Sequence, residues 1–183
     1  PWLLPSGSRA RATGGAVTVV DLPERRLVCV RHVGGIGALG APVARLVALA
    51  EERGWLDPSA WLVLVFHDDS MVVEEDAWRI DLGWELPAGE PAPPGFDLHV
   101  LPAGPHATLT AAGAADEINE AATRFLYEDI PASGLQPASF ESVLEVPAGY
   151  AWEALSDLPG LLARPMVARA LHHVGPPGAL LRG

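Results

Sequence analysis

The chain of 183 residues is acidic and apolar: 49% of its residues are hydrophobic, its formal net charge is −11, and all twelve basic residues are Arg. This composition suits a compact domain with a substantial core. The negative charge repels phosphate backbones, so we expect no direct contact of this chain with nucleic acid. The longest apolar runs are too short to cross a bilayer, and the lone Cys29 cannot form an internal disulfide. We therefore expect no membrane partner and a cytoplasmic location.

Residues 1–15 are predicted to form a linker-like arm because they are small, polar and rich in Gly. Extended segments follow from Ala16 to His32, and then a helix is predicted over 41–53. Its apolar residues recur at helical spacing and Gly54 is a suitable stop. The runs AWLVLVFHDD and DAWRIDLGWEL predict two further strands, so the first half has the order β-α-β-β.

The same order of elements begins again after the Pro-rich joint LPAGEPAPPG. Residues 97–113 are extended in pattern, residues 114–129 predict a helix, and ASFESVLEV predicts a strand. The fold class is therefore α+β, with two β-α-β-β modules, an antiparallel sheet and both helices on one side. Residues 16–146 are assigned to this domain. Residues 147–183 contain two short helical candidates and are assigned to a C-terminal extension of unknown role.

The stretch FHDDS contains potential metal ligands in His67, Asp68 and Asp69. Adjacent residues on an extended chain point to alternating sides, so these three side chains are not expected to close on one ion. The two aspartates are expected to accept hydrogen bonds from backbone N–H groups at a strand end. We predict no metal and no cofactor; the Gly-rich GGIGALG lacks the basic residue of a phosphate loop and predicts a strand-to-helix turn.

The strand around residues 78–86 alternates between two faces. Trp78, Ile80, Leu82, Trp84 and Leu86 share one face, and Arg79, Asp81, Gly83 and Glu85 share the other. Tryptophan on a strand serves packing or provides a ring for a flat or cationic ligand. Both alternatives stay open for Trp78 and Trp84.

Four stretches resemble the GyrI-like family, also known as the bacterial transcription-activator effector-binding domain. They are, in chain order, LPERRLVCVRHVGG, FHDDS, WRIDLGWEL and SFESVLEV. The resemblance covers about Val17 to Val146 and implies two β-α-β-β modules in a pseudo-two-fold pair with a ligand cleft between them. It also allows for a DNA-binding domain N-terminal to this chain. The corner has Ser70 where the family usually has Pro, and Val143 stands where a Tyr is common.

The resemblance implies that Glu141 projects into this cleft. A carboxylate among aromatic rings loses hydration, so we expect a raised pKa for Glu141. Tyr127 at the end of the second helix and His32 in the opening motif are further ligand-binding candidates, beside Trp78 and Trp84.

The resemblance implies a small-molecule binding function for aromatic, cationic compounds. The domain would then be the effector-sensing part of a transcription regulator or a stand-alone drug-binding protein. One alternative is a hydrolase that opens reactive cyclopropane-bearing natural products, with Glu141 as its catalytic residue. Another is a gyrase-inhibitor-like role with a protein partner. The other histidines show no catalytic spacing and are expected to be structural.

Overall fold

The computed structural model describes residues 17–55, 57, 59–139 and 141–175 of the chain. The predicted linker-like arm at residues 1–15 lies outside these residues. None of the helices in the described ranges combines the length and the apolar character needed to span a membrane.

The first module has the predicted order of one strand, one helix and two strands. Its elements are β2 (Arg25–Val33), α1 (Gly40–Arg53), β3 (Trp61–Phe66) and β4 (Arg79–Glu85). Short 3-10 turns at Ile36–Ala38 and Glu75–Ala77 precede α1 and β4. Helix α1 ends at Gly54, whose φ of 68° is a left-handed conformation that Gly adopts without a steric penalty. The apolar residues at helical spacing, among them Val43 and Leu46, form its buried face.

The second module repeats this order with an inserted helix. It consists of β6 (Gly104–Gly113), α2 (Ala115–Arg124), β8 (Ser142–Pro147) and β9 (Met166–Gly175). Helix α2 continues through a π-helical turn (Phe125–Asp129) into the short α3 (Ile130–Ala132), and β7 (Gln136–Pro137) pairs with β9. Helix α4 (Gly149–Ala163), kinked at Asp157, connects β8 to β9.

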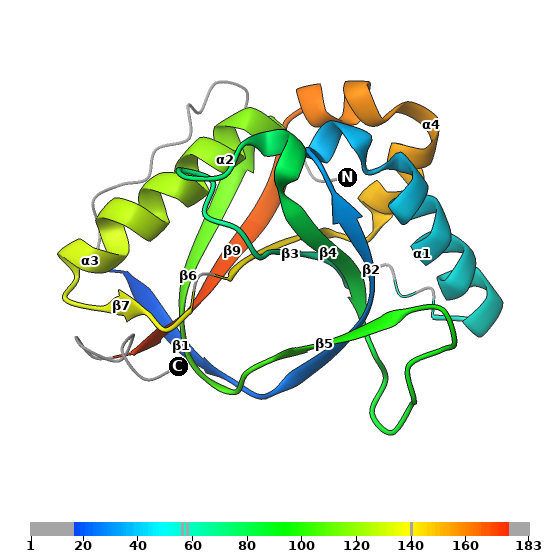
Figure 1. Cartoon of the computed structure of the whole chain (residues 1–183), viewed down its shortest axis with the longest axis horizontal. Helices are drawn as coiled ribbons and strands as arrows, with labels where there is room; N and C mark the ends of the chain where they lie inside the picture. Colours follow the sequence, from blue (N-terminus) through cyan, green and yellow to red (C-terminus); the bar gives the residue numbers. More distant parts are fainter. Residues whose placement is uncertain (1–16, 56, 58, 140, 176–183) are drawn as a thin grey trace.

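All neighbouring strands of the sheet are antiparallel, in the order β1-β6-β9-β8-β3-β4-β2-β5. The pseudo-two-fold axis passes between β3 and β8, where the modules meet. The outer strands are exchanged, because β1 (Thr18–Leu22) precedes β2 but pairs with β6, and β5 (Asp97–Leu101) precedes β6 but pairs with β2. Figure 1 shows the sheet curled into a half-barrel with the helices on its outer side. The predicted fold class is confirmed.

The two faces of the sheet have different surroundings. The helix face packs against α1, α2 and α4 through the largest apolar cluster, which includes Leu64, Leu82 and Trp84. The opposite face, called the inner face below, lies inside the curl. It has a smaller apolar cluster at Leu27, Val63, Val65, Leu101, Val143 and Leu171. Strand alternation thus separates two environments on one sheet.

Strand β9 lies in the segment that we predicted as an extension beyond residue 146. It is hydrogen-bonded to β6 on one side and to β8 on the other, from the Gly113–Met166 pair to the His106–His173 pair along β6. Between Met166 and Val174, its helix-face residues are small or polar (Ala168, Ala170, His172), so the period-two apolar signal is weak. The chain after β8 therefore supplies an interior strand of the sheet.

Candidate functional site

Two adjoining cavities lie on the helix face of the sheet, at strands β3 and β8, where the two modules meet. The larger has a volume of about 510 Å³ and is enclosed by β3, β8 and helices α1, α2 and α4. The smaller, of about 220 Å³, lies under α2 and α3. Phe66, Trp78, Asn119 and Leu144 line both cavities, so the two spaces share a wall.

The larger cavity is apolar with a few acidic groups. Its lining side chains are mostly aliphatic, with rings from Phe66, Trp78 and Tyr150. Glu75 and Asp116 are its charged members, and none of the described lining residues is basic. A volume of this size, with apolar walls and a few polar groups, is typical of a small-molecule site.

The corner at residues 67–69 forms part of the smaller cavity and sends its three side chains to different partners. Asp68 lies 2.6 Å from the Arg79 guanidinium and accepts a hydrogen bond from the Arg79 backbone N–H at 2.7 Å. These bonds hold the pKa of Asp68 below its usual value. Asp69 accepts a hydrogen bond from the Tyr127 hydroxyl, and His67 points to the inner face. The corner therefore contacts β4 and the π-helical turn that follows α2, and its three side chains diverge.

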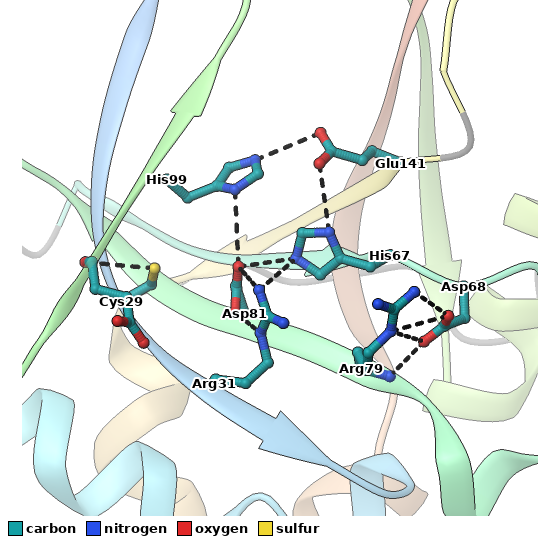
Figure 2. A network of polar contacts seen from close by, with 9 residues as sticks. Cys29, Arg31, His67, Asp68, Arg79, Asp81, His99 and Glu141 are labelled. Atoms are coloured by element: carbon teal, nitrogen blue, oxygen red, sulfur yellow. Dashed lines mark hydrogen bonds and ion pairs between the residues drawn. The ribbon is translucent and has the colours of Figure 1, made fainter. Parts of the chain in front are cut away.

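The inner face carries a cluster of charged side chains that come from five separate segments (Figure 2). Asp81 on β4 is almost fully buried and receives hydrogen bonds from Arg31 on β2 and from His67 after β3. His67 Nε2 lies 2.8 Å from Asp81 Oδ2, and His99 Nδ1 on β5 lies 3.7 Å from the same oxygen. Glu141, just before β8, lies on the other side of both rings, with oxygens 3.3 Å from His67 Nδ1 and 3.4 Å from His99 Nε2.

Sheet register explains why these residues meet. Arg31 is paired directly with Asp81, and Val65 is paired with Asp81 from the other neighbouring strand. His67 follows Val65 by two residues and therefore projects from the same face. Glu141 precedes Val143 by two residues, and Val143 is paired with Val65. Arg31 and Asp81 thus reach the inner face on their own strands, and His67 and Glu141 reach it where the chain continues the alternation of β3 and β8.

The cluster is strongly ionised. Hydrogen bonds to Asp81 and Glu141 raise the pKa of His67 to about 9, and the two histidines lower the pKa of Glu141 to about 2. Burial favours the neutral form of Asp81, but hydrogen bonds from His67 and Arg31 outweigh it and hold the pKa of Asp81 well below its usual range. The expectation of a raised pKa for Glu141 is wrong, because its neighbours are imidazoles and not aromatic hydrocarbons.

The candidates predicted from the sequence are distributed over different places. Trp78 lines both cavities, and its Nε1 donates to the Val73 carbonyl at 2.9 Å. Tyr127 lines the smaller cavity, and partial burial with the Asp69 contact raises the pKa of its hydroxyl. Trp84 is buried under α1, where its Nε1 donates to the Leu46 carbonyl at 3.0 Å.

The two remaining candidates lie outside both cavities. His32 Nε2 lies 3.2 Å from the Gly35 carbonyl, in the turn before α1. Glu141 lies on the inner face, on the other side of the sheet from the cavities. Whether these five residues bind a ligand stays a prediction.

Sequence reasoning missed Asp81, His99 and Arg31 as members of a site. Asp81 and His99 each occupy the polar position of an alternating strand, which is the signal that places them together on one face. Their convergence depends on strand neighbours, which a single sequence does not specify. For His67, the sequence shows only its chain neighbours Asp68 and Asp69 as possible partners.

The family of GyrI-like small molecule binding domains matches residues 16–147 of the chain. No curated protein matches it significantly in sequence. Among solved structures, the C-terminal domain of EcmrR is similar with a TM-score of 0.60 and 13% identity, over 87% of this chain and 97% of that one. In the EcmrR–DNA complex the TM-score is 0.62 at 12% identity over 87% of this chain, which spans only 57% of that EcmrR chain.

Two further structures share the fold at similarly low identity. A hydrolase from Listeria innocua matches with a TM-score of 0.57 and 12% identity, over 87% of this chain and 92% of that one. SAV2435 bound to tetraphenylphosphonium matches with a TM-score of 0.50 and 10% identity, over 88% and 94% of the two chains. At these identities the likeness concerns the fold alone.

Proposed function

Since the chain belongs to the family of GyrI-like small molecule binding domains, we propose that it binds an aromatic, cationic compound in the two adjoining cavities of the helix face. The observation that carries this proposal is the larger cavity of about 510 Å³, with apolar and aromatic walls and no basic group among its described lining residues. Rings of Phe66 and Trp78 can pack on a flat ligand, and Trp favours a cation over its face.

The acidic side chains at the cavities favour a positive charge on the ligand. Glu75 and Asp116 belong to the larger cavity and Asp69 belongs to the smaller one, whereas Asp68 is already paired with Arg79. The formal charge of −11 adds a field of the same sign. One of the neighbours in fold, SAV2435, has tetraphenylphosphonium bound, which makes this aromatic cation a suitable probe.

The domain's role in a larger protein belongs to the same proposal. EcmrR, which has this fold in its C-terminal domain, binds DNA as a longer chain. We propose that this chain is likewise an effector-sensing part of a cytoplasmic transcription regulator, with a DNA-binding domain N-terminal to it. A stand-alone drug-binding protein is the alternative. Neither requires direct contact of this acidic chain with DNA.

Titration calorimetry with tetraphenylphosphonium tests the cavity. Asn119 is exposed and lines both cavities, so Asn119→Arg places a positive charge on their shared wall without disturbing the core. We expect its affinity for the cation to fall about tenfold or more, from charge repulsion in a partly desolvated space. Glu120→Gln is the matched control, since it changes the net charge by the same amount on the same helix but lies outside both lining sets. Equal affinity for both variants and the wild type contradicts the proposal.

The hydrolase alternative depends on Glu141, which lies between two imidazoles. A general base for chemistry near pH 7 works best with a pKa close to that value. The pKa of about 2 for Glu141 and of about 9 for His67 favours a stable ion pair instead. The pKa of Glu141 is thus far from the value that suits a general base, which supports binding over hydrolysis.

Glu141→Gln separates the two functions in the same assay. With the ligand on the helix face, we expect tetraphenylphosphonium affinity to change less than about twofold, because the carboxylate lies across the sheet. A loss of about 1–3 kcal/mol, typical of a charge-assisted contact, would instead place the ligand on the inner face beside Glu141.

A further inference from the structure

We propose that the inner face of the sheet carries a binding site for a divalent transition metal ion of the zinc class, with His67, Asp81 and His99 as ligands. The set differs from the adjacent residues 67–69, whose side chains diverge. Its members come from β4, from β5 and from the segment after β3, and the curl of the sheet brings them together (Figure 2). Two imidazoles and one carboxylate form a ligand set that suits zinc and related ions.

The spacing of the ligand atoms is close to that of a metal centre. One ligating atom from each of the three residues lies within 4.8 Å of the other two. Two ligands of a tetrahedral zinc ion, each about 2.0–2.1 Å from the metal, are about 3.3 Å apart. The observed distances from Asp81 Oδ2 are 2.8 Å to His67 Nε2 and 3.7 Å to His99 Nδ1. The three ligand side chains therefore need only small rotations to bind an ion, provided that Arg31 Nη2 moves away from Asp81 Oδ2.

The second nitrogen of each imidazole is also accounted for. His67 Nδ1 and His99 Nε2, which face away from Asp81, both point to the carboxylate of Glu141 at 3.3 and 3.4 Å (Figure 2). A metal-binding histidine normally donates its other N–H to a carboxylate or carbonyl, which fixes the tautomer and orients the ring. Glu141 can serve both rings in this way. Arg31 Nε donates to the other oxygen of Asp81, but Arg31 Nη2 lies 3.0 Å from Asp81 Oδ2 and 3.5 Å from His67 Nε2, so this end of the guanidinium must move when an ion binds.

His99 gives separate evidence that the hydrogen bonds of this cluster are incomplete. Its Nε2 atom is buried and has no hydrogen bond of normal geometry within the described part of the chain, although it lies at ion-pair distance from Glu141. A buried imidazole nitrogen without a well-formed bond costs free energy. Binding an ion at Nδ1 would orient the ring and align Nε2–H with the Glu141 carboxylate.

Charge and access both allow an ion to enter. An ion can bind only after His67 releases the proton that it holds near pH 7, so metal binding competes with this proton. The cluster then has two carboxylates against the single positive charge of Arg31, whose side chain is 45% exposed and can move into solvent. Glu141 is 32% exposed and the two histidines are 14% and 15% exposed, so solvent reaches the cluster from the Glu141 side. Three protein ligands leave a fourth position for water.

Calorimetric titration of the chelator-treated chain with Zn²⁺ alone tests the site. We expect one ion per chain, and Co²⁺ in its place should give the intense visible absorption of a four-coordinate site. His99→Ala removes a ligand from the edge strand β5, where loss of fold is least expected, and should lower Zn²⁺ affinity by more than about a hundredfold. Glu141→Gln keeps all three ligands and should lower affinity by about 10–100-fold, as for other groups that orient a ligand.

His173→Ala is the matched control. His173 on β9 and His106 on β6 form a second histidine pair, with stacked rings whose centroids are 5.0 Å apart, and neither belongs to the proposed ligand set. The Zn²⁺ affinity of His173→Ala should equal that of the wild type. The proposal is overturned if the wild type binds no stoichiometric Zn²⁺, or if His99→Ala and His173→Ala change affinity equally. Since the cavities lie on the other face, we expect His99→Ala and the wild type to bind tetraphenylphosphonium equally, so this measurement separates the metal site from the proposed cavity function.

Discussion

Glu145 carries a carboxylate that the sheet buries completely, on the inner face of β8. Arg25 Nη1 lies 2.6 Å from one of its oxygens, and Arg169 Nε donates to the other at 2.6 Å. Arg25 also contacts Glu85 at 3.0 Å, and the Arg169 guanidinium lies over the Trp61 ring. A buried charge is tolerated only when it is paired and hydrogen-bonded, so each member depends on the others.

Removal of this charge should destabilise the protein strongly. We expect Glu145→Gln to lower the free energy of unfolding by about 3–5 kcal/mol, because the two arginines are left without their shared carboxylate. Glu85→Gln is the control: Glu85 is 57% exposed and pairs with the same Arg25, so its loss should cost less than about 1 kcal/mol. Urea denaturation of both variants measures the difference, and equal costs would show that the buried ion pairs contribute little.

At the scale of elements, β9 determines whether the second module can form. It is the shared neighbour of β6 and β8, and α4 returns the chain to place it there. Without β9 the backbone groups of two interior strands lose their partners, and the sheet is divided between β6 and β8. The family match ends at residue 147, before this strand.

A fragment of residues 17–147 should therefore fail to fold cooperatively, whereas a fragment of residues 17–175 should unfold in a single transition. The physical reason is that the first fragment retains β6 and β8 but not the strand that joins them. Near-ultraviolet circular dichroism together with urea denaturation distinguishes the two. A cooperative transition in the shorter fragment would mean that β9 is dispensable for the fold.

At the scale of the whole molecule, one curled sheet separates an apolar, cavity-containing helix face from an inner face with buried ion pairs. Titratable groups are buried on both faces, so the global stability depends on pH. His172 lies on the helix face of β9, packed near the Phe125 ring and lining the smaller cavity. Burial there lowers the pKa of His172 to about 4.

This shift predicts a loss of stability in mild acid. The folded-state pKa of about 4 is below the unfolded value of about 6.5, so the unfolded state binds a proton first as the pH falls. The contribution of His172 is fully present above pH about 6.5 and is lost as the pH falls toward 4, to a total of about 3 kcal/mol. His172→Gln should flatten the pH dependence of the unfolding free energy between these values. An unchanged slope in the variant would mean that other groups cause the wild-type dependence.

The order of elements up to β8, the bounds of α1 and the separation of His67, Asp68 and Asp69 followed from the sequence, because each depends on periodicity and turn residues within a short window. Strand β9 did not follow, because its segment was expected to contain short helices. Alternation also predicts correctly that Trp84 and Asp81 lie on opposite faces of β4. Which residues share one face of a strand depends only on their order along the chain.

The tertiary structure decided which residues each strand face contacts. Glu141 was expected in a cleft among aromatic rings but lies against His67 and His99, because pairing of β8 with β3 and of β5 with β2 determines its neighbours. Arg25 and Glu145 are 120 residues apart in the chain and in direct contact in the fold. The sequence alone determined the first module, the second module as far as β8, their periodicities and the family. The inner-face cluster, the place of β9 and the cavities required the pairing of distant strands, which no local pattern specifies.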